Sequence, residues 1–169
     1  MIIVLNGPLG IGKSTLAEAL CEAIDQCVML DGDQLVAANP PPGDEFEYLH
    51  AIIELLVAHH RQSGYRHFVI NHSWITPAGF GDLHRRLTKL ETVADIHCFR
   101  LTLPVSENLR RIERRASARA LNERELERQT FAKESEAFGK GGVDLGEPFD
   151  VSAPPAELVA TMLRRLGLS

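Results

Sequence analysis

Cysteine, aromatic residues and long apolar runs are scarce in this sequence, and each scarcity excludes a class of protein. The three cysteines are widely spaced and form no C-x-x-C pair, which argues against a disulfide scaffold or a zinc site and favours a reducing cytoplasm. No apolar run approaches the roughly 18 to 20 residues that span a bilayer. Met1 leads into Ile2 without the basic stretch of a signal peptide. We therefore expect a cytoplasmic protein with no membrane partner.

An excess of basic side chains is also missing. The 169 residues include 18 lysines and arginines against 23 acidic residues, a formal net charge of −5. A broad, sequence-independent grip on nucleic acid needs the opposite balance, so no nucleic-acid partner is expected. The length suits one compact domain over residues 1–169, as a monomer or a homodimer.

Short apolar runs alternate with helical stretches along the whole chain. A spacing of three to four residues between apolar side chains predicts a helix, whereas a short continuous apolar run predicts a buried strand. The predicted strands are 1–6, 27–31, 67–73, 94–103 and 148–151. The predicted helices are 13–25, 44–63, 77–90 and 155–166, and Gly167 is the expected C-cap of the last. Pro104 begins a further, Arg-rich helix, and Asn122 with Glu125 resembles a capping box that begins another. The alternation predicts an α/β domain with a mostly parallel sheet covered on both faces.

The strongest motif is a glycine-rich loop between the first predicted strand and the first predicted helix. It reads Gly7-Pro8-Leu9-Gly10-Ile11-Gly12-Lys13-Ser14, a full match to G-x-x-x-x-G-K-[ST]. The glycines let successive backbone N–H groups turn inward as a nest for phosphate oxygens, and the helix that follows adds its positive dipole. Lys13 can reach the β- and γ-phosphates, Ser14 can ligate Mg²⁺, and Thr15 adds a hydroxyl toward the α-phosphate. The loop predicts a nucleoside triphosphate with Mg²⁺ as its ligand.

Two aspartates follow the second predicted strand, in Leu30-Asp31-Gly32-Asp33. Residues two apart in an extended segment point to the same side, so we expect Asp31 and Asp33 to face one crevice at the carboxyl end of the strand. One carboxylate, assigned to Asp31, would hold hydrated Mg²⁺, and Asp33 would accept the proton of an attacking hydroxyl. The alternative is a solvated turn with no chemical role.

Further motifs separate the classes of protein that share the glycine-rich loop. The N-K-x-D motif of GTPases and the L-S-G-G-Q-like segment of transporter ATPases are absent, and no predicted strand ends in the Asp-Glu pair of oligomeric ATPase modules. With the loop GPLGIGKST, the segment LDGD and the arginines near residue 115, the chain resembles the small-molecule kinases of the P-loop group. That group includes shikimate kinase, gluconate kinase, adenylylsulfate kinase, chloramphenicol phosphotransferase and the nucleoside monophosphate kinases.

The resemblance implies a P-loop fold with a five-stranded parallel sheet, with ATP bound by the loop residues up to Thr15. It implies an acceptor-binding segment at 34–64 and a mobile arginine-bearing lid at about 115–124. The stretch Phe149-Asp150-Val151-Ser152 resembles the segment that borders the adenine in relatives, although Val151 stands where they have threonine.

Seven arginines lie between residues 110 and 128, and guanidinium groups stabilise the charge that develops in phosphoryl transfer. Arg115 and Arg119 are the two expected to contact phosphate, because they approach the lid. For most of the others, a solvated helix face with glutamate partners is the expected place.

The acceptor is expected to contact Asp31, Asp33 and His72, beside Trp74 and the proline-rich loop 40–42. His72 either makes a polar contact with the substrate or is a structural histidine, and the sequence leaves both open. No arginine occurs between residues 36 and 60, which favours an uncharged or weakly charged acceptor over the phosphorylated acceptor of a nucleoside monophosphate kinase.

These observations predict an ATP-dependent phosphotransferase that moves the γ-phosphoryl group to a hydroxyl of a small molecule. Its predicted catalytic residues are Lys13, Asp33, Arg115 and Arg119, and its predicted metal ligands are Ser14 and Asp31. One alternative is a nucleotide-binding regulatory or antibiotic-resistance protein that transfers no phosphate. The other is a nucleoside or nucleotide kinase.

Overall fold

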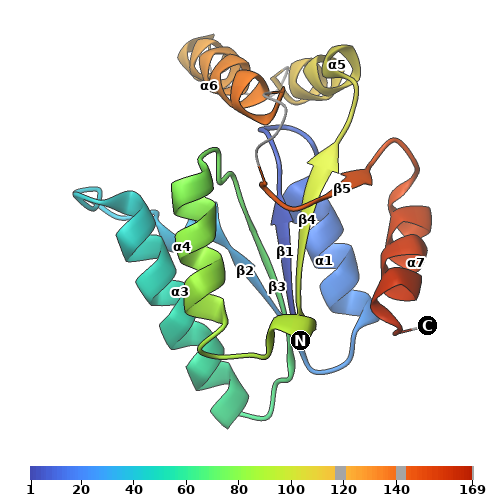
Figure 1. Ribbon diagram of the computed structural model, residues 1–169. Helices are drawn as coiled ribbons and strands as arrows, with labels where there is room; N and C mark the ends of the chain where they lie inside the picture. Colours follow the sequence, from blue (N-terminus) through green and yellow to red (C-terminus); the bar gives the residue numbers. More distant parts are fainter. Residues whose placement is uncertain (117–120, 140–143, 169) are drawn as a thin grey trace.

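The computed structural model describes residues 1–116, 121–139 and 144–168, and its centre is a parallel sheet (Figure 1). Within these ranges five strands are ordered β2-β3-β1-β4-β5, and every neighbouring pair is parallel. This confirms the predicted α/β class and its five-stranded sheet. The strands are β1 (Ile2–Asn6), β2 (Cys27–Asp31), β3 (His67–His72), β4 (Ile96–Thr102) and β5 (Glu147–Asp150).

Helices cover both faces of the sheet, as the continuous apolar strands require. The helices α3 (Glu45–Gln62) and α4 (Pro77–Leu87) pack on one face, and α1 (Lys13–Ala23) and α7 (Pro155–Leu166) pack on the other (Figure 1). Alternate residues of β1 enter the two cores: Ile2 and Val4 join the first, Ile3 and Leu5 the second. Because β1 is buried on both faces, the core fixes where its carboxyl end lies, and the loop that follows begins at that edge of the sheet.

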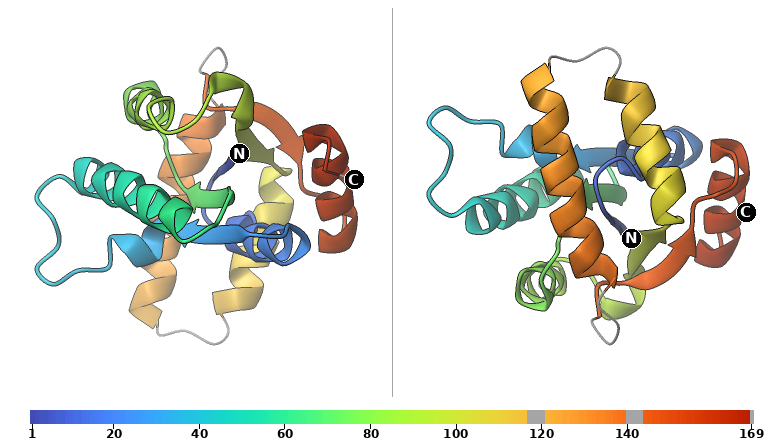
Figure 2. Two further views of the ribbon diagram at one scale, coloured as in Figure 1. Left: turned by 90° about the horizontal axis from the view of Figure 1, so that it is seen from below. Right: turned by 90° about the horizontal axis from the view of Figure 1, so that it is seen from above.

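Two further helices, α5 (Val105–Ala116) and α6 (Leu121–Gly139), lie beyond the carboxyl ends of the strands (Figures 1 and 2). Asn122 already lies inside α6, so the expectation that Asn122 caps this helix is wrong. The expected C-cap of α7 is confirmed, since Gly167 has a left-handed φ of 68°. A 3₁₀ turn, η1 (Val93–Asp95), leads into β4. In the described part of the chain, no helix is long and apolar enough to cross a membrane.

One short helix, α2 (Gly32–Leu35), follows β2 and was not predicted. The carboxylate of Asp31 is its N-cap and accepts the backbone N–H groups of Asp33 and Gln34. The chain therefore leaves the extended conformation directly after Asp31, and the prediction that strand alternation places Asp31 and Asp33 on one side is wrong. Both residues still lie at the carboxyl edge of the sheet, but their side chains have different partners.

Candidate active site

The glycine-rich loop connects β1 to α1 and folds around the side chain of Lys13. Gly12, the N-cap of α1, has a φ of 105° that side-chain-bearing residues rarely adopt. The Lys13 ammonium is buried and donates hydrogen bonds to the carbonyl of Gly7 (2.8 Å) and to the hydroxyl of Ser73 (2.9 Å). Ser73 in turn donates to the same Gly7 carbonyl (2.9 Å). The loop and the end of β3 thus hold the lysine together.

Ser14, Asp31 and Asn71 meet beside this lysine, each from a different element. The Ser14 hydroxyl donates to Asp31 Oδ2 (2.9 Å), and Asn71 Nδ2 donates to the same oxygen (2.9 Å). Asn71 Oδ1 is buried and has no hydrogen-bond partner among the described residues. Hydroxyl, carboxylate and amide oxygens are the ligands that Mg²⁺ prefers. The residues present therefore fit the metal that the sequence analysis assigned to Ser14 and Asp31.

Asp33 lies in α2 and pairs with His72 at the end of β3. Its Oδ1 is 2.9 Å from Nδ1 of His72, and the side chains are 72% and 8% exposed, respectively. The hydrogen bond from His72 lowers the pKa of Asp33, and the charges of His72 and Lys13 add to this against the opposing effect of burial. Asp33 is therefore an ionised, accessible carboxylate at neutral pH.

Trp74 does not line an open surface. It is fully buried, and its indole N–H donates to Nε2 of His50 (3.0 Å). The expectation that the acceptor lies beside Trp74 is wrong, because the residue packs into the core between the sheet and α3 and α4.

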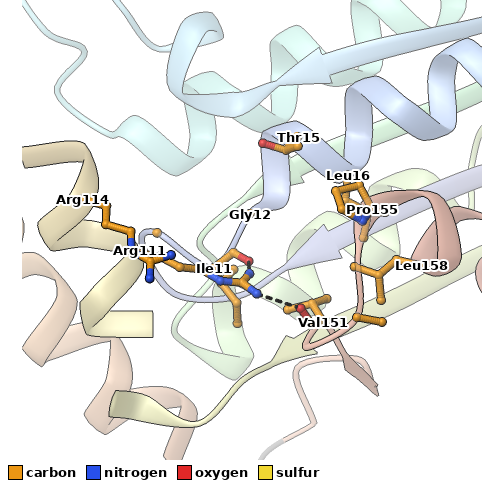
Figure 3. A pocket seen from close by; sticks show the side chains of 11 residues that line it. Ile11, Gly12, Thr15, Leu16, Arg111, Arg114, Val151, Pro155 and Leu158 are labelled. Atoms are coloured by element: carbon orange, nitrogen blue, oxygen red, sulfur yellow. Dashed lines mark hydrogen bonds between the residues drawn. The ribbon is translucent and has the colours of Figure 1, made fainter. Parts of the chain in front are cut away.

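Arg111 of α5 joins the glycine-rich loop to the segment after β5. Its guanidinium donates to the carbonyls of Ile11 and Val151 (both 3.1 Å). Beside it opens a cavity of about 310 Å³, lined also by Thr15 and Arg114 (Figure 3). The cavity adjoins the loop at the position where the resemblance to P-loop kinases implies the adenine, and Val151 contributes to its wall.

The two arginines that were predicted to contact phosphate, Arg115 and Arg119, stay predictions. Arg119 lies outside the described residues, and Arg115 lies in α5 but its side chain is outside those described. Arg111, one turn before Arg115 in the same Arg-rich helix, was counted among the arginines expected on a solvated face and instead contacts the loop. It also assigned no role to Asn71 and Ser73; the polar run after the apolar residues of β3 was the available signal.

The helices beyond the sheet also hold the backbone of Leu9, in the middle of the loop. Glu134 of α6 accepts the Leu9 N–H (2.6 Å), and Asn108 of α5 donates to the Leu9 carbonyl (3.2 Å). A carboxylate is therefore bound to one amide of the predicted phosphate nest. No local sequence pattern predicted this contact.

The comparisons with known proteins agree with this arrangement. The model of a family described as an AAA domain matches residues 2–138, most of the chain. The chain belongs to this P-loop family. The match implies that the chain binds a nucleotide. The Asp-Glu pair of this chain, Asp44-Glu45, stands at the start of α3 and does not follow a strand, unlike the pair of oligomeric ATPase modules. No curated protein matches the chain.

Three solved structures illustrate what this member of the AAA domain family resembles. The Deinococcus radiodurans tunicamycin resistance protein has a TM-score of 0.71 at 19% identity, over 99% of this chain and 96% of that one. A gluconokinase from Sinorhizobium meliloti 1021 has a TM-score of 0.67 at 21% identity, over 98% and 90%. A shikimate kinase from Bacteroides thetaiotaomicron has a TM-score of 0.62 at 13% identity, over 99% of both chains. These likenesses establish the kinase-like P-loop fold.

Proposed function

We propose that the chain is an ATP-dependent phosphotransferase that moves the γ-phosphoryl group to a hydroxyl of a small, uncharged or weakly charged molecule. The observation that carries the proposal is Asp33, an exposed carboxylate at the carboxyl edge of the sheet that is ionised at neutral pH and so can accept a proton. A protein that only bound nucleotide would have no need of a base at this place.

Each group at this edge of the sheet has a part in the proposed reaction. The amides of the loop and Lys13 hold the triphosphate, and the cavity beside Arg111 holds the nucleobase of ATP. Ser14 and Asp31 would hold Mg²⁺, with Asn71 beside them; the ion supplies charge neutralisation at the β- and γ-phosphate oxygens. Arg115 and Arg119 remain the predicted contacts for the charge that develops during transfer.

The chemical step is an in-line displacement. The oxygen of the acceptor hydroxyl forms a bond to the γ-phosphorus, its proton passes to Asp33, and the bond from the γ-phosphorus to the β–γ bridging oxygen breaks to release ADP. A positioned general base contributes about 10²–10⁴-fold. The larger share of the acceleration then comes from holding the two substrates in line and from the surrounding positive groups.

The charge of the acceptor segment supports an uncharged or weakly charged substrate. The acceptor segment 34–64 contains one arginine and no lysine, and Arg61, at the C-terminal end of α3, is engaged by an ion pair with Glu91. Arg86 of α4 reaches this segment, but it is engaged there by ion pairs with Glu47 and Glu54. A phosphate or carboxylate on the acceptor would therefore meet carboxylates without a cation to hold it.

A second candidate is a nucleotide-binding regulatory or resistance protein that sequesters a ligand and transfers no phosphate. The observation that favours it is the high structural similarity to the tunicamycin resistance protein. The loop and the cavity beside Arg111 serve this function equally well, so Asp33 separates the two candidates.

The deciding experiment measures ADP release from Mg·ATP with a panel of nucleosides, sugars, hydroxy acids and antibiotics as acceptors. We expect at least one acceptor to stimulate ADP release, and Lys13→Ala to abolish the stimulated rate while its thermal unfolding stays close to that of the parent. Saturable Mg·ATP binding without stimulation by any acceptor supports the second candidate. A Lys13→Ala protein that transfers phosphate at the parent rate overturns the proposed role of the loop.

A further inference from the structure

We propose that His72 is a positioning residue: its buried ring fixes the Asp33 carboxylate in the orientation that receives the proton of the acceptor hydroxyl. This inference rests on the proposed phosphotransfer. It places His72 behind the base, and so differs from the expectation that His72 contacts the acceptor itself.

The order of the two side chains follows from their exposure. The Asp33 side chain is 72% exposed, and that of His72 is 8% exposed. The carboxylate thus lies on the solvent side of the ring. The hydrogen bond from Nδ1 of His72 engages Oδ1 of Asp33, so Oδ2 is the oxygen offered to an acceptor.

Asp33 needs such a partner because its own helix is short. The helix α2 has four residues, and its backbone is held at the start by the carboxylate of Asp31, which accepts the Asp33 N–H (3.0 Å). That bond fixes the backbone and leaves the side-chain torsions free. An exposed carboxylate samples several rotamers, whereas proton transfer requires the oxygen to stay within hydrogen-bond reach of the hydroxyl.

The His72 ring is itself held from three sides. A Cβ atom on Gly32 would lie 2.7 Å from Cβ and 2.8 Å from Nδ1 of His72, so only glycine allows the backbone of α2 to lie this close to the ring. Trp74 and Phe46 contact the ring edge-on, with centroids 5.2 Å and 6.1 Å away. Rigid aromatic neighbours leave the imidazole little freedom to turn.

Trp74 is anchored in turn by hydrogen bonds at both its backbone and its side chain. Its N–H donates to Oδ1 of Asn6 (2.9 Å), and its carbonyl accepts from Nδ2 of Asn6 (3.0 Å). Its indole N–H donates to Nε2 of His50, which leaves Nδ1 of His50 to donate to Asp82 (2.8 Å). The support of Asp33 thus extends from β1 through the core to α4.

The other charged groups around Asp33 serve the nucleotide side. Lys13 from α1 is held by the carbonyl of Gly7 and the hydroxyl of Ser73, and Asp31 at the end of β2 faces Ser14. From α3 the residue that faces His72 is Phe46, which carries no charge. His72 is the side chain that the geometry assigns to the orientation of Asp33.

The test is a double-mutant cycle with Asp33→Asn and His72→Leu, measured with the acceptor found above. His72→Leu is expected to lower kcat about 100-fold with the KM for ATP unchanged, and His72→Asn, whose amide places an N–H near the position of Nδ1, is expected to restore most of that loss. The double variant is expected to be no slower than Asp33→Asn alone, because His72 acts through Asp33. His59→Leu, at the exposed far end of α3, is the matched control and should keep the parent kcat.

A readout without any acceptor separates this inference from the proposed function. In ¹⁵N-labelled protein, the Nδ1 of His72 should carry a hydrogen-bonded proton whose resonance moves in Asp33→Ala. An unmoved resonance, a parent-like kcat in His72→Leu, or losses that add in the double variant would each overturn the inference. If no acceptor is phosphorylated, the proposed function fails while the resonance still decides the pairing.

A second comparison serves if His72→Leu does not fold. It sets His72→Asn against His72→Gln, whose amide lies nearer the position of Nε2, and equal rates in the two variants overturn the inference.

Discussion

At the scale of single residues, Asp31 and Asp33 are two positions apart and have entirely different neighbours. Asp31 accepts from Ser14 and Asn71 and caps α2. Asp33 bonds to His72 and is open to solvent. An aspartate is therefore suited to bind a metal ion at position 31 and to accept a proton at position 33, because the fold gives the two side chains different partners.

Asp33→Asn is expected to lower the rate of phosphoryl transfer by about 10²–10⁴-fold and to leave Mg·ATP affinity close to that of the parent. The amide cannot take the proton, whereas Lys13 keeps its hydrogen bond to the carbonyl of Gly7 and Ser14 keeps its hydrogen bond to Asp31. Acceptor-stimulated ADP release gives the rate, and titration calorimetry gives the affinity. Equal losses in both would mean that Asp33 supports the structure of the site and not the chemistry.

Local sequence patterns predicted the residues of the glycine-rich loop, because its function depends on a short contiguous motif. They did not predict how Asp31 and Asp33 point, since Asp31 itself ends the strand by capping α2. The contact of Leu9 with Glu134 joins residues 125 positions apart, and no local pattern encodes such a separation. Arg115 and Arg119 stay predictions, because the side chain of Arg115 and the whole of Arg119 lie outside the described residues.

At the scale of elements, α5 and α6 are tied to the glycine-rich loop by polar bonds. Arg111 and Asn108 of α5 donate to the carbonyls of Ile11 and Leu9, and Glu134 of α6 accepts from Leu9. The Glu134 carboxylate places negative charge at a loop that is proposed to hold a triphosphate. The negative charges of the Glu134 carboxylate and of a bound triphosphate would repel each other.

Glu134→Gln is therefore expected to bind Mg·ATP more tightly, by about 3- to 10-fold, as measured by calorimetry at low ionic strength. The matched control is Glu125→Gln, which removes the same charge from an exposed position of α6 where the carboxylate accepts a hydrogen bond from Gln129. The control should bind like the parent. Weaker binding in Glu134→Gln would show that the contact maintains the loop and does not compete with phosphate.

The positions of the helices and strands were largely predictable, since apolar spacing and capping residues act within a few positions. Each predicted strand is found within two residues of its expected ends. The short helix α2 was missed because four residues show no apolar period. The placement of α5 and α6 over the loop depends on contacts with distant residues, such as that of Arg111 with Val151.

At the scale of the whole molecule, buried ionisable groups join α3 to α4 behind the site. His50 of α3 is buried, and burial lowers its pKa. Its hydrogen bond, with help from Arg86, lowers the pKa of Asp82 to about 2. Both shifts link the stability of the fold to pH.

Stability is expected to fall as the solution is acidified, in two stages. In the unfolded chain His50 takes up a proton near pH 6.5, whereas in the folded protein its lowered pKa keeps it neutral to a lower pH. The contribution of His50 to the free energy of unfolding is therefore complete above about pH 6.5 and declines below it. Asp82, shifted from 3.8 to about 2, adds a further loss between about pH 4 and pH 2, worth at most about 2 kcal/mol. Urea unfolding at pH 7.5, 5.5 and 3 measures both stages.

The variant His50→Gln should lose less stability than the parent between pH 7.5 and 5.5. Part of the dependence should persist, because burial also lowers the pKa of His67. An unchanged difference between the two pH values in His50→Gln would assign the first stage to another group. Asp82→Asn should likewise flatten the second stage.

The divided use of Asp31 has a practical consequence for anyone who tries to dissect this protein. One oxygen closes the first turn of α2 and the other faces Ser14 and Asn71. Truncation to alanine would therefore fray the turn that carries Asp33 and remove the proposed magnesium ligand in a single change. Asparagine preserves an oxygen for the turn while discarding the negative charge. Comparing Asp31→Asn with Asp31→Ala therefore separates weaker binding of the proposed magnesium ion from a displacement of Asp33.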